Sequence, residues 1–295
     1  MISQGELKAT YDKQGYVVYD NLLSEEIVAE LKTVTNHLVT AAGANKGSNE
    51  TYEFVEEIKG GPSRLERINS PHKVDPLFDQ LIRKDEIINV LRLLLGKDIR
   101  MQGSKLNLKS GGGSSAVEWH QDWAFYPHTN DDVLAVGIMI DDMTSNNGPI
   151  MFVPGSHKGP LYDHCSDGYF CGAVKPDIAV AQSKSAQVIT GKAGSVTFHH
   201  CRLLHASKMN QSANARHFLL YEVMSADAWP LAGCHALYDS MEGMNERIIS
   251  GEQTMFPRLR QAPVRLPQPT LPNATSIYVQ QRYGDHQIYS DESHG

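Results

Sequence analysis

The apolar residues of this chain change their spacing near residue 98, and this change limits the folds open to it. Upstream, the segments at about 4–14, after Ser24 and at 75–95 carry apolar residues at helical intervals. Downstream, short apolar runs are separated by turn residues, as is typical of strands. Helices followed by many short strands predict a mainly β, α+β fold in which helices pack on a β core.

The expected strands lie at 133–140, 149–153, 186–190, 194–198 and 216–223. In the segment that begins at residue 98, Leu106 and Leu108 alternate with Lys105 and Asn107, so the two sets face opposite sides of a strand. The polar pair therefore faces either the interior of the β core or the solvent beside an edge strand.

The length of 295 residues fits either two domains or one large decorated β domain. We expect one domain over 1–295, with a helical part at about 1–97, a β core at about 98–225 and an extended segment at about 226–295. The last segment holds five prolines between 257 and 272, which favour an extended path. The polar, glycine-rich stretch at 42–63 is either a mobile lid or an ordinary surface loop.

Composition excludes several classes of function. The net charge of −7 provides no overall positive field for nucleic acid or an anionic membrane. No uninterrupted apolar stretch is long enough to span a bilayer, and the first residues lack the apolar core of a signal peptide. The four cysteines have no CxxC spacing and fit free thiols in a reducing compartment. We therefore expect a cytoplasmic protein without a nucleic-acid or membrane partner.

The motif Glu118-Trp-His120-Gln-Asp122 is the strongest local indication of chemistry. On a strand or at its end, residues two apart point to one face, so His120 and Asp122 converge. With one more imidazole they would form the two-histidine, one-carboxylate face that leaves metal positions open in non-haem Fe(II) oxygenases. The motif alone is weak evidence, because His-x-Asp occurs by chance in many chains.

A third ligand could come from the segment 194–223, which holds His199, His200 and His205 near the end of an expected strand. Arg216 follows His205 by eleven residues, at the start of the next strand, on the face of that strand that points inward. A buried arginine needs an anionic partner, and its planar guanidinium suits a carboxylate. These residues predict a metal at one end of a pocket and a carboxylate-binding arginine at the other.

In three sequence blocks, 119–134, 143–159 and 194–229, the chain resembles the phytanoyl-CoA dioxygenase family of Fe(II)/2-oxoglutarate oxygenases. The family's His-x-Asp, a strand near Asn-Gly, Pro-Gly-Ser-His, and a distal histidine eleven residues before an arginine all occur here in order. The resemblance extends over most of the chain, from residue 15 onward. It implies a double-stranded β-helix, or jelly roll, with the N-terminal helices packed on one sheet.

The resemblance also implies a role for each matching residue. His120, Asp122 and His205 match the iron ligands of the family. Arg216 matches the residue that binds the distal carboxylate of 2-oxoglutarate, and Ser207 matches a second contact to that carboxylate.

The resemblance makes two further residues candidates for contact with the cosubstrate. Arg67 falls where relatives have a lysine that contacts 2-oxoglutarate, and Lys105 falls where they have an apolar neighbour of it. If either residue is not engaged by the cosubstrate, it could hold an acidic group of the substrate. The chain departs from the family at Ile138, where relatives place a tryptophan, and this affects only the packing around the cosubstrate.

Residues near the metal motif are candidates to line the substrate pocket: Trp123, Phe125, Tyr126 and Asn107. An aromatic run is also typical of a core, so this interpretation competes with a purely structural one. His199 and His200 are expected to support the site rather than to bind metal.

The resemblance implies an enzyme that uses Fe(II), 2-oxoglutarate and O2 to hydroxylate a small-molecule metabolite at an unactivated C–H bond, releasing succinate and CO2. The carboxylate of Asp122 favours hydroxylation, because related halogenases have a small residue there. The alternatives are desaturation or another oxidation at the same site, a zinc-dependent hydrolase, and a non-catalytic jelly-roll binding protein. We expect a monomer or a homodimer.

Overall fold

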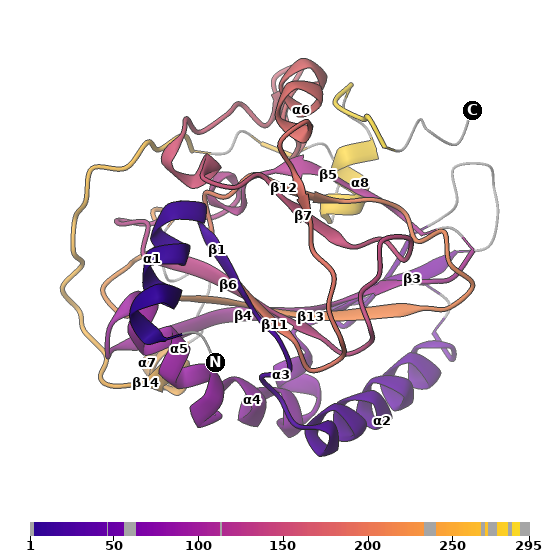
Figure 1. Ribbon diagram of the computed structural model, residues 1–295, viewed down its shortest axis with the longest axis horizontal. Helices are drawn as coiled ribbons and strands as arrows, with labels where there is room; N and C mark the ends of the chain where they lie inside the picture. The colour runs from indigo at the N-terminus through magenta and orange to yellow at the C-terminus, as the bar shows by residue number, and fades with distance from the viewer. Residues whose placement is uncertain are drawn as a thin grey trace.

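The computed structural model describes residues 3–45, 47–55, 63–112, 114–232, 240–266, 269–270, 276–282 and 285–289. Within them, two antiparallel sheets face one another and helices cover the outer side of the larger sheet (Figure 1).

The larger, eight-stranded sheet supplies most of the framework. Its strands, in spatial order, are β1 (Tyr16–Tyr19), β11 (Val196–His200), β6 (Val133–Met139), β13 (Arg216–Ser225), β4 (Ile99–Lys109), β3 (Arg64–Asn69) and β2 (Tyr52–Val55), with β14 (Ile248–Ser250) also paired to β4.

The smaller sheet has four short strands in the order β10 (Gln187–Val188), β7 (Ile150–Phe152), β12 (His205–Ser207) and β5 (Val117–His120). A separate hairpin joins β8 (Cys165–Ser166) to β9 (Tyr169–Phe170).

The helices are α1 (Gln4–Gln14), α2 (Glu25–Ala42), α3 (Pro71–Val74), α4 (Pro76–Ile82), α5 (Asp85–Leu95), α6 (Pro176–Ser183), α7 (Met241–Glu246) and α8 (Ile277–Arg282). Side-chain caps explain where several of them begin. The hydroxyl of Ser24 accepts from the Ile27 amide at the start of α2, and the carboxylate of Asp75 accepts from the Leu77 amide at the start of α4. The stretch 75–95, expected as one helix, is divided into α4 and α5, because Lys84 adopts an extended conformation before α5.

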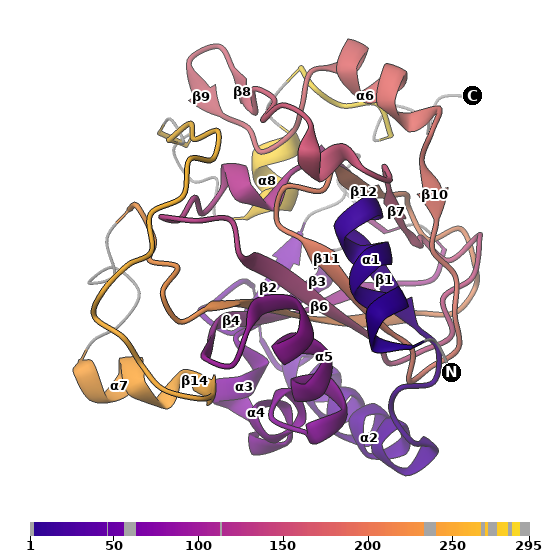
Figure 2. The same cartoon turned by 60° about the vertical axis from the view of Figure 1, so that its left-hand side comes forward.

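Strand alternation gives the larger sheet two different faces. Its outer face buries Leu106, Val136 and Leu219 against helix residues such as Leu31 and Phe78, so this layer is the main hydrophobic core (Figure 2). Its inner face turns toward the smaller sheet. The predicted jelly roll with N-terminal helices packed on one sheet is confirmed.

Two expectations about segments need correction. The region after residue 225 is not uniformly extended, because α7, β14 and α8 lie within it. The polar stretch 42–63 is not a loop throughout, because β2 pairs with β3 there. Lys46 and residues 56–62 of that stretch lie outside the described residues. In the part of the chain described, every helix is too short or too polar to cross a membrane.

Gly137 on β6 is a test of the close packing of side chains on the inner face of the larger sheet. A methyl group on this glycine would overlap the ring of Phe218 and the hydroxyl of Thr197. We expect Gly137→Ala to lower the free energy of unfolding by about 1–3 kcal/mol, the usual cost of overpacking a core. Urea denaturation measures the change.

Gly103→Ala is the matched control for this substitution. It also places an alanine inside a strand of the same sheet, but the nearest atom, Glu222 Oε2, would lie 3.6 Å from the new methyl group. We expect its stability to stay within about 1 kcal/mol of wild type. Equal stability of the two variants would contradict this description of the core.

Candidate active site

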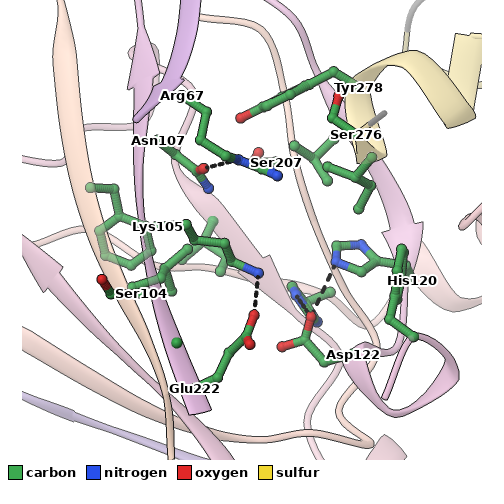
Figure 3. A pocket seen from close by; sticks show the side chains of 18 of the residues that line it. Arg67, Ser104, Lys105, Asn107, His120, Asp122, Ser207, Glu222, Ser276 and Tyr278 are labelled. Atoms are coloured by element: carbon green, nitrogen blue, oxygen red, sulfur yellow. Dashed lines mark hydrogen bonds and ion pairs between the residues drawn. The ribbon is translucent and has the colours of Figure 1, made fainter. Parts of the chain in front are cut away.

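A cavity of about 390 Å³ lies between the inner face of the larger sheet and the smaller sheet (Figure 3). Its walls come from β3, β4, β5, β7, β11, β12 and β13, and α8 closes one side. All three expected metal ligands, the expected cosubstrate residues and most of the expected substrate residues line it. Segments far apart in the sequence therefore meet at a single site.

His120, Asp122 and His205 form the one cluster of potential metal ligands among the described residues. His120 ends β5 and His205 begins β12, and the two residues are directly opposite in the antiparallel pairing of these strands. Asp122 follows in a short 3₁₀ turn, Asp122–Ala124. Its Oδ1 lies 3.7 Å from His120 Nε2 and 4.0 Å from His205 Nε2.

Backbone carbonyls orient both imidazoles. His120 Nδ1 lies 2.8 Å from the carbonyl oxygen of Glu118, and His205 Nδ1 lies 2.9 Å from that of Leu203. Each Nδ1 therefore carries the proton and donates it, which leaves Nε2 with a free lone pair on the side of Asp122. Such hydrogen bonds from the second ring nitrogen are the usual way of fixing a metal-binding histidine.

Burial and neighbouring charges put all three groups in the protonation state that binds a metal. Burial lowers the pKa of His120 and of His205, so both rings are neutral at neutral pH. For Asp122, burial raises the pKa, but nearby positive charge, above all the Lys105 ammonium, outweighs this effect, and the pKa lies below its usual range. Two neutral imidazoles and one carboxylate result.

Gln121, between two of these residues, holds the motif in place. Its side-chain amide donates to the carbonyls of Pro160 and Arg202 and accepts from the amide of Tyr162. Its backbone amide donates to His164 Nε2. A fully buried glutamine with every group paired is a rigid connection between His120 and Asp122.

The Pro-Gly-Ser-His segment fixes the third ligand. Gly155 has a positive φ of 80°, which favours glycine. The hydroxyl of Ser156, the next residue, accepts from the backbone amide of Leu204 at 2.8 Å. This contact lies directly before His205, so the motif positions the start of β12.

Arg216, at the start of β13, lines the same cavity and is 2% exposed. Its Nη2 donates to the carbonyl of Gly148, which has a positive φ of 73° in the Asn-Gly turn, while its buried Nε has no hydrogen-bond partner. Burial lowers the pKa of Arg216 to about 10, so the guanidinium stays charged at neutral pH. An unsatisfied buried cation facing a cavity fits an anionic ligand. Ser207 lines the same cavity.

Arg67 on β3 is held by three neighbours. Its Nε donates to Asn107 Oδ1 at 3.0 Å, its Nη1 lies 3.8 Å from the Glu53 carboxylate, and its guanidinium lies over the ring of Tyr278, 4.9 Å from the centroid. Asn107, expected near the substrate, thus orients Arg67 from the adjacent strand.

Lys105 points into the cavity from β4, so the alternative of a solvated edge strand is wrong. Its Nζ lies 3.2 Å from Glu222 Oε1 on β13, as Figure 3 shows. It is also the positive group that lowers the pKa of Asp122 most. Lys105 therefore lies at the metal-ligand end of the cavity.

The aromatic candidates divide into two groups. Phe125 and Tyr126 line the cavity, and the Phe125 ring packs edge-on against His120. Trp123 does not line it, so that expectation is wrong. Its indole is fully buried in a separate cluster and donates to the carbonyl of Pro263.

The two neighbouring histidines also differ. His199 lines the cavity beside His205, with ring centroids 5.2 Å apart. His200 faces away, toward Asp131 and His157. Neither belongs to the cluster of potential metal ligands.

Sequence reasoning missed Glu222, Ser276 and Tyr278. Glu222 could have been identified from the sequence, because strand alternation places this residue on the same face as Arg216 and Phe218. Ser276 and Tyr278 could not have been identified in this way. Their segment was expected to be extended, and no sequence pattern connects it to the cavity.

The residues present fit a metal and a dicarboxylate. Nitrogen and oxygen ligands lie about 2.0–2.2 Å from a divalent metal such as zinc, and iron is similar, so adjacent ligands are about 3 Å apart. The three donor atoms lie within 4.8 Å of one another, so a contraction of about 1–2 Å would bring them to that spacing. The open side of the cluster faces the cavity, and Arg216 offers an unpaired donor for a carboxylate.

Comparison with known proteins places the chain in a family. The family model described as phytanoyl-CoA dioxygenase matches residues 11–218. The chain is 38% identical over 282 residues to a probable alpha-ketoglutarate-dependent hypophosphite dioxygenase of Stutzerimonas stutzeri. The aligned region covers 94% of this chain and 96% of that protein. The chain is 27% identical over 250 residues to the ectoine dioxygenase of Bordetella bronchiseptica, covering 79% and 74%.

Solved structures agree with this assignment. The crystal structure of EctD from S. alaskensis with 2-oxoglutarate and 5-hydroxyectoine superposes with a TM-score of 0.63 at 25% identity, covering 76% of this chain and 77% of that one. The predicted enzyme class, an Fe(II)/2-oxoglutarate-dependent dioxygenase, is confirmed, and the alternatives of a zinc hydrolase and a non-catalytic binding protein are not supported. The chain belongs to the phytanoyl-CoA dioxygenase family.

Proposed function

We propose that this dioxygenase hydroxylates a small metabolite, with His120, Asp122 and His205 holding Fe(II). In the same proposal, Arg216 and Ser207 bind the distal carboxylate of 2-oxoglutarate. The observation that carries it is the shared cavity, in which two oriented Nε2 atoms and a carboxylate face one another and a buried, incompletely paired guanidinium lies farther along.

When bound, iron with 2-oxoglutarate and O2 supplies the oxidant for the substrate, and succinate and CO2 are released. The residues of the chain have simpler tasks. The carbonyls of Glu118 and Leu203 keep the two imidazoles in one tautomer. The packed walls of the cavity limit the access of water and hold the substrate beside the metal ligands.

Arg67 has the second cationic role in this proposal. It lies between Asn107 and Tyr278 and faces the cavity, so it can contact 2-oxoglutarate as the family lysine would. Phe125 and Tyr126 form part of the wall around the substrate.

The size of the cavity supports a small substrate. Its 390 Å³ lies near the lower end of the roughly 300–1,000 Å³ typical of ligand pockets, and it must hold 2-oxoglutarate as well. The relatives are named for hypophosphite and ectoine, both small molecules. We propose hydroxylation at C–H or, for a substrate like hypophosphite, at P–H, with desaturation as the alternative outcome.

The expectations of a cytoplasmic protein and of a monomer or homodimer without a nucleic-acid or membrane partner stay predictions. Sedimentation in solution would measure the oligomeric state.

Arg216→Ala tests the cosubstrate site. Loss of charge-assisted hydrogen bonds worth about 1.5–3 kcal/mol should weaken 2-oxoglutarate binding roughly 10- to 100-fold. Anaerobic titration of the Fe(II)-loaded protein measures the Kd, and Arg216→Lys, which keeps the charge, should lie between wild type and Ala. A Kd unchanged in Arg216→Ala would remove this residue from the site.

The identity of the distal ligand is tested by alanine substitution of three histidines. His205→Ala should abolish iron-dependent turnover, because it removes one of three donor atoms. His199→Ala and His200→Ala should retain measurable activity, since neither belongs to the cluster of potential ligands. Iron content and succinate release are measured together. Loss of iron from His200→Ala but not from His205→Ala would show that the assignment is wrong.

Asp122 provides the only negative charge among the proposed ligands. Asp122→Ala should lower iron affinity and abolish hydroxylation, whereas Asp122→Glu should bind iron better than Ala yet turn over far more slowly than wild type. The extra methylene moves the oxygens by more than the about 0.5 Å that such a site tolerates. Wild-type iron occupancy and succinate yield from Asp122→Ala would contradict the proposed function.

A further inference from the structure

The proposed function does not assign the ion pair between Lys105 and Glu222 to the binding of the metal or of 2-oxoglutarate. Both side chains line the cavity, and they are 24% and 18% exposed. A charged pair in the wall of a cavity costs desolvation, so its presence beside the metal ligands calls for an explanation.

Strand register separates Lys105 from the cosubstrate end. Arg216 is opposite Lys109 in the β13–β4 pairing, and Lys105 is four residues farther along β4. At about 3.3 Å per residue, the two positions are about 13 Å apart. The terminal carbons of 2-oxoglutarate are only about 5 Å apart, since four carbon–carbon bonds of about 1.5 Å join them. The cosubstrate is therefore much shorter than the strand segment that separates Arg216 from Lys105.

The geometry of the cavity places Lys105 on the metal side. Figure 3 shows its ammonium and Glu222 in the same part of the cavity as Asp122, and all three residues line that cavity. A group that binds to the Lys105 ammonium is thus held beside the metal ligands, where the reaction takes place.

The Lys105 ammonium also has unused capacity. It has three N–H donors, and the Glu222 carboxylate is its one hydrogen-bonding partner among the described residues. Glu222 reaches it from the neighbouring strand, two residues beyond Leu220, which is directly opposite Lys105. Glu222 therefore holds the ammonium over the cavity with donors to spare.

We infer that Lys105 is the substrate-binding residue of this enzyme and that it takes the anionic group of a small oxyanion. The inference rests on the proposed function, and it assigns Lys105 to the substrate rather than to 2-oxoglutarate. Glu222 is a positioning residue that fixes the ammonium and, through its own negative charge, limits how tightly an anion is held. A substrate anchored in this way has its reactive bond close to its charge.

This assignment predicts opposite effects for the two members of the pair. Lys105→Met keeps the length of the side chain and removes the charge, so anion affinity should fall roughly 10- to 100-fold. Glu222→Gln keeps a hydrogen-bond acceptor for Lys105 and removes the competing charge, so anion affinity should be equal or higher. If Glu222 instead bound a cationic group of the substrate, its substitution would weaken binding.

The test is calorimetric titration of the anaerobic protein, loaded with Fe(II) and 2-oxoglutarate, with four probe anions: hypophosphite, formate, acetate and methylphosphonate. The double variant Lys105→Met/Glu222→Gln removes both charges of the pair, so neither is left without its partner, and it distinguishes lost binding from lost folding. Lys192→Met is the matched control, because this exposed lysine also pairs with a carboxylate, that of Asp142.

We expect at least one anion to bind to wild type and to Lys192→Met, and to bind at least 10-fold more weakly to both variants that lack Lys105. Equal affinity in those variants, weaker binding in Glu222→Gln, or no binding of any of the four anions to wild type would overturn the inference. Iron content and the 2-oxoglutarate Kd are measured first on each protein. If the wild-type protein bound neither iron nor 2-oxoglutarate, this result would contradict the proposed function rather than the inference about Lys105.

Discussion

The antiparallel pairing of β5 with β12 is the contact on which the site depends. It places His120 directly opposite His205, although 85 residues separate them in sequence, and their ring centroids are 4.0 Å apart. Directly opposite residues in such a pair have Cβ atoms about 4.5–5.5 Å apart, so the strand register itself sets the spacing of the two imidazoles. Two hydrogen bonds beside the ligands stabilise this register. The side-chain amide of Gln121 donates to the carbonyl of Pro160, and the hydroxyl of Ser156 accepts from the amide of Leu204.

The larger sheet makes the rest of the site possible by separating two environments. Its outer face packs against the helical layer in the main hydrophobic core, which provides the hydrophobic stabilisation. Its inner face can therefore carry Lys105, Asn107 and Arg216, residues that a core would not accept. These charges are tolerated because neighbouring strands supply partners, and because the incomplete pairing of Arg216 leaves it ready for a ligand.

Most of this arrangement could be predicted from periodicity and motif spacing, which indicated the helical part and the strands of the β core, and which left two directions open for Lys105. Contacts made by segments without periodicity could not be predicted from the sequence. The break between α4 and α5 depends on the conformation of one residue, Lys84, and the approach of Tyr278 to Arg67 depends on the tertiary packing of α8. Trp123 was misplaced because an aromatic residue beside a motif fits a core as well as a pocket.

A crystal structure of the anaerobic protein with Fe(II) and 2-oxoglutarate tests the central claim most directly, because it observes the two ends of the cavity together. The account predicts a metal within about 2.2 Å of His120 Nε2, His205 Nε2 and an oxygen of Asp122, with the distal carboxylate of 2-oxoglutarate on Arg216 and Lys105 still beside Glu222. A metal bound elsewhere, or a distal carboxylate bound to Lys105 instead of Arg216, would contradict it.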